Sequence, residues 1–264
     1  MKFTGVLKKM KTELSTEVQY FMDFPENIIH VNQLLDKNIH LRFKGYQCLN
    51  CGKDKPIFRQ GFCYDCFYES PQTGEWVIKP ELSTAHLNQQ DRDLEYEKKV
   101  QLQPHIVYLA HSGHVKVGIT RKTQVPTRWI DQGAHQALPL LETPNRYLAG
   151  VAEVALKAHI SDKTNWRNML QNNLDKVDIL SVRKALKPFI PEELSPYFIS
   201  ETPITEINFP VLSYPKKIKS FTFKKNLEYQ GVLKGIKGQY LIFEDGTVLN
   251  VRSNSGYIVD LDIH

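Results

Sequence analysis

Four cysteines constrain this chain more than any other feature of its sequence. They form two C-x2-C pairs separated by eleven residues, and no other cysteine occurs: Cys48, Cys51, Cys63 and Cys66. Paired thiolates at this spacing are typical ligands of a tetrahedral zinc ion, and four of them leave no coordination position open for a substrate. The pattern therefore predicts a zinc ribbon with a structural metal. Two alternatives stay open: an iron–sulfur cluster, or four reduced cysteines packed as small apolar residues.

The composition is that of a globular protein. Hydrophobic residues make up 41% and charged residues 24% of 264 residues, which favours about two or three domains and excludes a wholly disordered chain or a coiled coil. No apolar run is long enough for a membrane helix, and the start lacks the apolar core of a secretory signal. We therefore expect a cytoplasmic protein. The net charge of +5 permits an anionic partner such as nucleic acid without requiring one.

The pattern of apolar residues predicts an α+β protein with small β units at both ends. Alternation at 18–24 and 39–43 predicts strands before the cysteines, and similar runs recur after residue 221. The expected segments are an N-terminal β segment (1–44), the zinc ribbon (45–70), a wrapping segment or linker (71–103), an α/β core (104–187), an extended proline-rich connection (188–215) and a C-terminal β meander (216–264).

The expected core begins with a β-hairpin. An apolar run at 106–110 and alternation at 115–119 flank the turn signal Ser112-Gly113-His114. Helical spacing then predicts helices over 127–134, 148–160 and 174–187.

The hairpin sequence HIVYLAHSGHVKVGIT resembles the opening hairpin of the GIY-YIG endonuclease superfamily. Ile106-Val107-Tyr108 stands in the place of GIY, and Lys116-Val117-Gly118 in the place of YIG. The cysteine block and the segments GITRKTQVPTRWIDQGA, NRYLAGVAEVALK and DKTNWRNML also resemble, over nearly the whole chain, a bacterial family known as domain of unknown function 2797.

The resemblance to the nucleases implies a magnesium-dependent phosphodiesterase site in a GIY-YIG-like core. Tyr108 would help to activate the attacking water, Arg128 would steady the scissile phosphate, and Glu153 would hold one magnesium ion. Lys116 replaces the second tyrosine of the nuclease pattern; it can bind phosphate but is a poor substitute for a phenol. Asn165 and Asn168 are both candidates for the late asparagine of the nucleases.

Each of these residues also has a purely structural interpretation. Tyr108 fits a strand aromatic in the core, and Arg128 fits a salt-bridged helix residue. Glu153 falls off the apolar stripe of its helix, so we expect it to be exposed, where it either faces a cleft or pairs with Lys157 at i,i+4. The function is accordingly left open between an enzyme, a non-catalytic nucleic-acid or ligand-binding module on a decayed nuclease scaffold, and a protein-interaction protein.

Basic residues favour nucleic acid as a partner. Aromatic residues alternate with cations around the cysteines, a combination that suits phosphate neutralisation and base stacking. Further lysines crowd the C-terminal region: Lys216, Lys217, Lys219, Lys224, Lys225, Lys234 and Lys237. The alternative is a lysine-rich strand face that is simply solvated. The polar segment 128–134 (RWIDQGA) fits either a ligand pocket or a helix N-terminus with a buried tryptophan.

Overall fold

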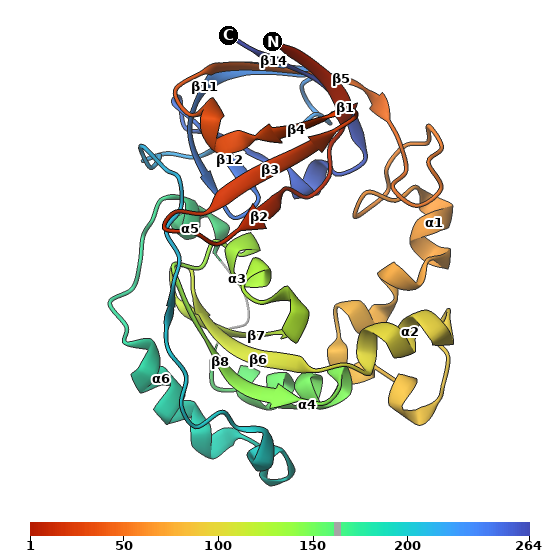
Figure 1. Cartoon of the computed structure of the whole chain (residues 1–264), viewed down its shortest axis with the longest axis vertical. Coiled ribbons are helices and arrows are strands. Elements are labelled where there is room, and N and C mark those ends of the chain that lie inside the picture. Colours follow the sequence, from red (N-terminus) through yellow and green to blue (C-terminus); the bar gives the residue numbers. More distant parts are fainter. Residues whose placement is uncertain (161–164) are drawn as a thin grey trace. The chain divides into compact units, whose positions relative to one another are not determined.

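The computed structural model describes residues 1–160 and 165–264, and its contacts divide the chain into two compact units (Figure 1). Unit 1 comprises Met1–Tyr68, Leu170–Asn172 and Ile207–His264; unit 2 comprises Glu69–Met169 and Asn173–Glu206. The mixed α+β class predicted from the sequence is confirmed. The first three residues of the DKTNWRNML segment lie outside the described residues.

Strands from both ends of the chain form one seven-stranded sheet in unit 1. Its order is β1-β14-β5-β11-β12-β13-β10. The strands are β1 (Lys2–Val6), β5 (Asn38–Tyr46), β10 (Lys219–Phe221), β11 (Glu228–Lys237), β12 (Tyr240–Phe243), β13 (Thr247–Asn250) and β14 (Tyr257–Ile263). β5 pairs antiparallel with both β11 and β14. The expectation of separate β units at the two ends is therefore wrong, because alternation identifies strands without identifying their partners.

Unit 1 also contains a smaller sheet and one helix. The sheet has the order β2-β3-β4 and consists of β2 (Lys11–Glu13), β3 (Gln19–Phe24) and β4 (Asn27–His30). Helix α1 (Tyr64–Glu69) begins directly after Cys63.

Two of the C-terminal lysines do not lie free on a phosphate-binding face, contrary to expectation. Lys237 is fully buried; its ammonium donates a hydrogen bond to Asn172 Oδ1 at 2.9 Å and lies over the rings of Phe209 and Tyr214. Burial lowers the pKa of Lys237 to about 8. Lys234 forms ion pairs with acidic side chains at 2.8 and 3.4 Å. Strand alternation shows which residues share a face, but it does not show whether that face is covered.

The sheet of unit 2 contains the predicted hairpin. Its order is β7-β6-β8-β9, with β6 (His105–His111), β7 (Val115–Arg121), β8 (Gln136–Thr143) and β9 (Thr205–Glu206). β6 and β7 pair antiparallel, and Tyr108 lies directly opposite Gly118. β7 is the edge strand, so one side of the hairpin is left for other elements to cover.

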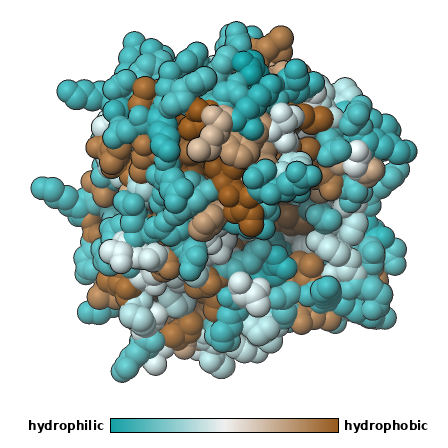
Figure 2. All heavy atoms as spheres, turned by 45° about the horizontal axis from the view of Figure 1, so that its top comes forward, coloured by the Kyte–Doolittle hydropathy of each residue, from teal (hydrophilic) through white to brown (hydrophobic). Residues whose placement is uncertain are grey.

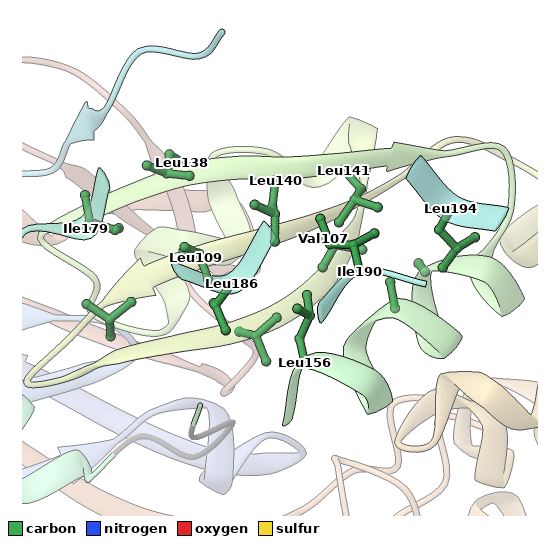
Figure 3. Packing of buried hydrophobic residues seen from close by; sticks show 14 residues of the cluster. Val107, Leu109, Leu138, Leu140, Leu141, Leu156, Ile179, Leu186, Ile190 and Leu194 are labelled. Atoms are coloured by element: carbon green, nitrogen blue, oxygen red, sulfur yellow. The ribbon is translucent and has the colours of Figure 1, made fainter. Parts of the chain in front are cut away.

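Helices α3 (Thr127–Asp131) and α4 (Arg146–Lys157) lie on opposite faces of this sheet (Figure 1). Figure 3 shows the apolar side chains of β6 and β8 pointing toward α4, α6 (Ile179–Leu186) and the residues that follow α6. The buried residues of this hydrophobic core that Figure 3 labels are Val107, Leu109, Leu138, Leu140, Leu141, Leu156, Ile179, Leu186, Ile190 and Leu194. The remaining helices of the described chain are α2 (Leu94–Gln101) and α5 (Trp166–Leu170).

The helices are shorter than the periodicity predicts. Asn145 caps α4, its side-chain oxygen accepting a hydrogen bond from the Leu148 amide at 2.9 Å, so this helix begins two residues before the predicted start. Helix α3 ends before Gly133, whose φ of +67° is the left-handed conformation that stops helices.

The segment from 71 to 87 contains four short 3-10 turns, and one of them, Pro80–Leu82, packs closely on α4. Gly150 makes this approach feasible. A Cβ atom at this position would lie 2.4 Å from the amide nitrogen of Glu81 and 2.6 Å from the carbonyl carbon of Pro80. Both are backbone atoms, which cannot move aside as the end of a flexible side chain can.

Gly150→Ala is expected to destabilise the protein, although alanine normally favours a helix over glycine by about 1 kcal/mol. The added methyl group overpacks the contact with Pro80 and Glu81, at a cost of about 1–3 kcal/mol. Thermal or urea unfolding measures the change. Val154→Ala, at an exposed position on the same helix, is the control and should change little. A Gly150→Ala variant more stable than wild type would contradict this packing.

None of the helices in the described part of the chain combines the length and apolar character needed to cross a membrane. On the face seen in Figure 2, hydrophobic residues lie among more numerous hydrophilic ones.

Candidate functional site

Tyr108, Arg128 and Glu153 line a single pocket in unit 2. The pocket has a volume of about 120 Å³ and lies beside the edge strand β7. Its lining residues come from five places in the sequence: Val77, Ile78 and Pro80; Tyr108; Val117, Gly118 and Ile119; Arg128 and Gln132; Arg146 and Glu153. The three residues proposed from the sequence therefore meet, although as many as 45 residues separate them along the chain.

Tyr108 is completely buried at the inner end of this pocket. Its ring packs edge-on against Trp129, with the ring centroids 6.0 Å apart. A Cβ atom at Gly118 would lie 2.7 Å from the Tyr108 hydroxyl oxygen, so only glycine opposite the tyrosine leaves room for this ring. Glycine in the YIG-like element thus has a local steric role.

The hydroxyl of Tyr108 has no hydrogen-bond partner among the described residues. Burial raises the pKa of Tyr108 above its ordinary value, and Glu153 acts in the same direction. Arg128 and Gln132 face the phenol and act in the opposite direction, but they do not meet hydrogen-bonding geometry. At neutral pH the side chain is a neutral phenol turned toward a polar pocket.

Arg128 and Gln132 enter the pocket from α3 and the residue that caps it. Both are half-buried. Arg128 has no carboxylate within ion-pair distance in the described part of the chain, so its interpretation as a salt-bridged helix residue is wrong. The polar segment 128–134 contributes both to the pocket and, through Trp129, to the packing against Tyr108.

Glu153 is buried, with 8% of its surface exposed, contrary to the expectation of an exposed residue. The apolar stripe of α4 faces the core, and the 3-10 turn at 80–82 covers the neighbouring side of the helix, which periodicity alone does not show. Glu153 lines the pocket and also forms the i,i+4 ion pair with Lys157, at 3.4 Å. Glu153 thus faces the pocket and pairs with Lys157 at the same time, and its role as a metal ligand stays a prediction.

Arg146 was not identified from the sequence. It is the first residue of α4, two helical turns before Glu153, and it reaches the same pocket. Its Nε and Nη2 groups donate hydrogen bonds to the carbonyl oxygens of Trp76 at 3.2 Å and Val77 at 2.8 Å. Its guanidinium carbon lies 5.5 Å from the Trp76 ring centroid. Its spacing of seven residues before Glu153, which places both on one side of a helix, is a sequence signal that could have found it.

Lys116 does not line the pocket. It lies opposite Ala110 in the hairpin and is only 4% exposed. The asparagine candidates also lie elsewhere: Asn165 caps α5 through its side-chain oxygen, and Asn168 is exposed.

The four cysteines converge in unit 1. Their Sγ atoms all lie within 4.8 Å of one another, and three of the four side chains are buried. A zinc–thiolate tetrahedron with bonds of about 2.3 Å has edges of about 3.8 Å, so small side-chain rotations suffice to close it. The second pair lies at the start of α1 rather than on a strand, and one isolated bridge, Arg59–Phe62, precedes it. The arrangement can bind a metal ion; a full ribbon stays a prediction.

The backbone around Cys48 favours its thiolate, whereas Asn50 favours the Cys66 thiolate but burial and the neighbouring sulfurs outweigh it and raise the pKa of Cys66. The Cys63 amide donates a hydrogen bond to Cys48 Sγ at 3.3 Å, and Gly52 turns the first pair with a φ of +70°. Burial disfavours the Cys48 thiolate, but the backbone amides of Cys51, Cys63 and Asn50 outweigh burial and lower the pKa of Cys48 to about 6.

Only some of the aromatic residues near the cysteines join the small core there: Phe62 is buried in it and Phe67 packs against it. Tyr64 and Tyr68 of α1 are exposed and contact Phe58, with ring centroids 5.2 and 5.9 Å away. Among the cations, Lys55 is paired with Asp65 at 2.6 Å.

Comparison with known protein families gives a match over most of the chain. The family model described as "Protein of unknown function (DUF2797)" matches residues 36–259, which is well over half of the chain and includes both the cysteine cluster and the pocket. No curated protein and no solved structure shows significant similarity to the chain. With a match of this length, the chain belongs to the DUF2797 family.

Proposed function

We propose that this protein binds nucleic acid and hydrolyses phosphodiester bonds in the pocket of unit 2, on a core of the GIY-YIG type. The observation that carries the proposal is that Tyr108, Arg128 and Glu153 line one pocket. A phosphodiester has to gain negative charge on the way to its transition state, and a guanidinium supplies the complementary charge. A phenol and a carboxylate beside it offer the other two groups that such a hydrolysis needs.

Magnesium fits this pocket as an ion that arrives with substrate. Mg²⁺ is held by one or two carboxylates together with waters and substrate phosphates. Glu153 supplies one carboxylate, and no second acidic side chain lines the described pocket. When bound, the ion would neutralise charge on the phosphate and lower the pKa of a bound water. Glu153 would hold it, while Arg128 would orient the phosphate.

We further propose that the four cysteines hold a structural zinc ion. Four thiolates complete a tetrahedral shell, so the metal stabilises the loops of unit 1 and takes no part in the reaction. Reduced thiolates of this kind fit a reducing compartment, in line with our expectation of a cytoplasmic protein.

A second candidate function is a non-catalytic binding module on the same scaffold. Two observations favour it: Lys116 stands in the place of the second tyrosine, and the pocket is small, with Tyr108 fully buried. A rigid duplex does not reach such a pocket without distortion, whereas a flexible single strand can enter it.

Incubation with single- and double-stranded DNA and RNA, with magnesium or manganese and with EDTA, separates the two functions. The enzyme is expected to cleave at least one single-stranded substrate only when a divalent ion is present. Binding that weakens steeply with salt but leaves every substrate intact would favour the non-catalytic module. Absence of both binding and cleavage would reject the proposal.

A further inference from the structure

Arg146 is a half-buried cation that forms no ion pair with the residues that the structure describes. Its guanidinium contacts two carbonyl oxygens and the face of Trp76, and no carboxylate of the described residues lies within ion-pair distance of it. Burial lowers the pKa of Arg146 to about 10, so the guanidinium is still protonated at neutral pH. A charge that is largely withdrawn from water is costly unless it is paired, and the position of this guanidinium in the pocket points to an anion from outside the protein.

The charges of the pocket favour an anion with two negative charges. Glu153 pairs with Lys157 at 3.4 Å and also favours the charge of Arg146 without an ion-pair contact, so two positive charges remain after the lysine and glutamate charges cancel. Arg128 and Arg146 then remain as two guanidinium groups with no paired carboxylate in the described chain, both lining the same pocket. A phosphodiester carries one negative charge, and the attack of an anionic oxygen on phosphorus raises this to two. A phosphate monoester at the end of a strand carries two from the start.

The size of the pocket limits what reaches both arginines. A volume of about 120 Å³ accommodates one tetrahedral group rather than a run of backbone. The segment 76–80 bounds it on one side, and the Arg146 guanidinium holds the carbonyl groups of Trp76 and Val77 there. The two hydrogen bonds use only part of the five donor sites of a guanidinium, so others remain for a ligand.

We infer that Arg146 is a second phosphate-holding residue, which together with Arg128 clamps one phosphate group carrying two negative charges. The inference rests on the proposed function for the identity of the anion as a phosphate. The clamp holds the scissile phosphate as its charge grows during hydrolysis, and it also accepts the terminal phosphate of a strand. Arg146 therefore couples the position of segment 76–80 to occupation of the pocket.

Titration of the full-length protein with inorganic phosphate by calorimetry tests the clamp. The pH is set so that phosphate is mostly dianionic, and acetate serves as a monoanion for comparison. Wild type should bind phosphate at least about tenfold more tightly than acetate. Arg146→Gln and Arg128→Gln should each weaken phosphate binding about tenfold or more, because each removes charge-assisted hydrogen bonds.

Arg167→Gln is the matched control, since Arg167 also stacks on a tryptophan, Trp166 at 4.3 Å, but is exposed and lies outside the pocket. This variant should bind phosphate as wild type does. Arg146→Lys keeps the charge and loses the planar fork, so intermediate affinity is expected. If Arg146→Gln does not fold, Arg146→Lys decides: affinity equal to that of wild type would overturn the clamp.

The outcome is separable from the proposed function. If phosphate binding depends on both arginines but the protein cleaves no nucleic acid, the clamp is upheld and the proposed nuclease activity is rejected. Cleavage of nucleic acid together with wild-type phosphate affinity in Arg146→Gln would uphold the nuclease and overturn the clamp. A wild type that does not distinguish phosphate from acetate would overturn the clamp as well.

Discussion

Tyr108→Phe is expected to abolish cleavage of nucleic acid without lowering stability. The hydroxyl is buried and has no hydrogen-bond partner in the described chain, so its removal should leave the free energy of unfolding unchanged or raise it by about 1 kcal/mol. Loss of a group that handles a proton at the reacting water should reduce the cleavage rate about 100-fold or more. Single-turnover cleavage and urea unfolding of the same preparation give both quantities.

The pH dependence of the wild type follows from the same residue. Because burial raises the pKa of Tyr108 above its ordinary value, the phenol is neutral at neutral pH and its phenolate fraction grows only as the pH becomes alkaline. If the phenolate accepts a proton from water, the cleavage rate should rise over this range in wild type, and Tyr108→Phe should lose that rise. Tyr147→Phe is the control: Tyr147 lies on α4 and stacks on His86, with ring centroids 4.3 Å apart, outside the pocket. A Tyr108→Phe variant that is less stable and equally active would make the residue a core aromatic only.

Cys48→Ser is expected to reduce zinc content from about one ion per chain to well below one and to destabilise unit 1. The Sγ atom of Cys48 lies among the other three sulfurs and accepts the Cys63 amide, so its loss opens the coordination shell and leaves that donor without its sulfur acceptor. Metal binding of this kind contributes directly to folding, and a three-ligand site should bind far more weakly. Elemental analysis and thermal unfolding check the two effects.

Lys53→Ser is the control for the cysteine substitution, because Lys53 lies in the same loop and offers no thiolate. Its zinc content should equal that of wild type, and chelation by EDTA should destabilise both proteins. A folded, reduced wild type that contains no metal would contradict the zinc assignment. If the purified protein contains iron and acid-labile sulfide, the site holds an iron–sulfur cluster instead of zinc.

Local sequence patterns predicted those parts of the structure that depend on local spacing. The cysteine pairs predicted a cluster because the two residues of each pair are only three positions apart. The hairpin register, with Tyr108 opposite Gly118, follows from two short strands joined by a tight turn. The resemblance to nucleases then grouped Tyr108, Arg128 and Glu153, and the structure places these three around one pocket.

Contacts between distant segments could not be predicted in this way. The pairing of β5 with β11 and β14 joins residues separated by about 200 positions, and no alternating pattern specifies such a partner. The segment 76–80 lies about 70 residues before Arg146, within the stretch 71–103 that was expected to be a wrapping segment or linker. Because the sequence does not reveal this contact, it predicted neither the burial of Glu153 nor the second arginine of the pocket.

We propose that the pocket hydrolyses phosphodiester bonds and that Glu153 holds the magnesium ion. The most direct measurement is the magnesium-dependent cleavage rate of single-stranded nucleic acid by wild type, Glu153→Gln and Glu142→Gln. Glu142 is the matched control, since it also pairs with a lysine, Lys122 at 2.7 Å, but lies outside the pocket. We expect cleavage by wild type and Glu142→Gln and none by Glu153→Gln. Cleavage that survives in Glu153→Gln would contradict the claim.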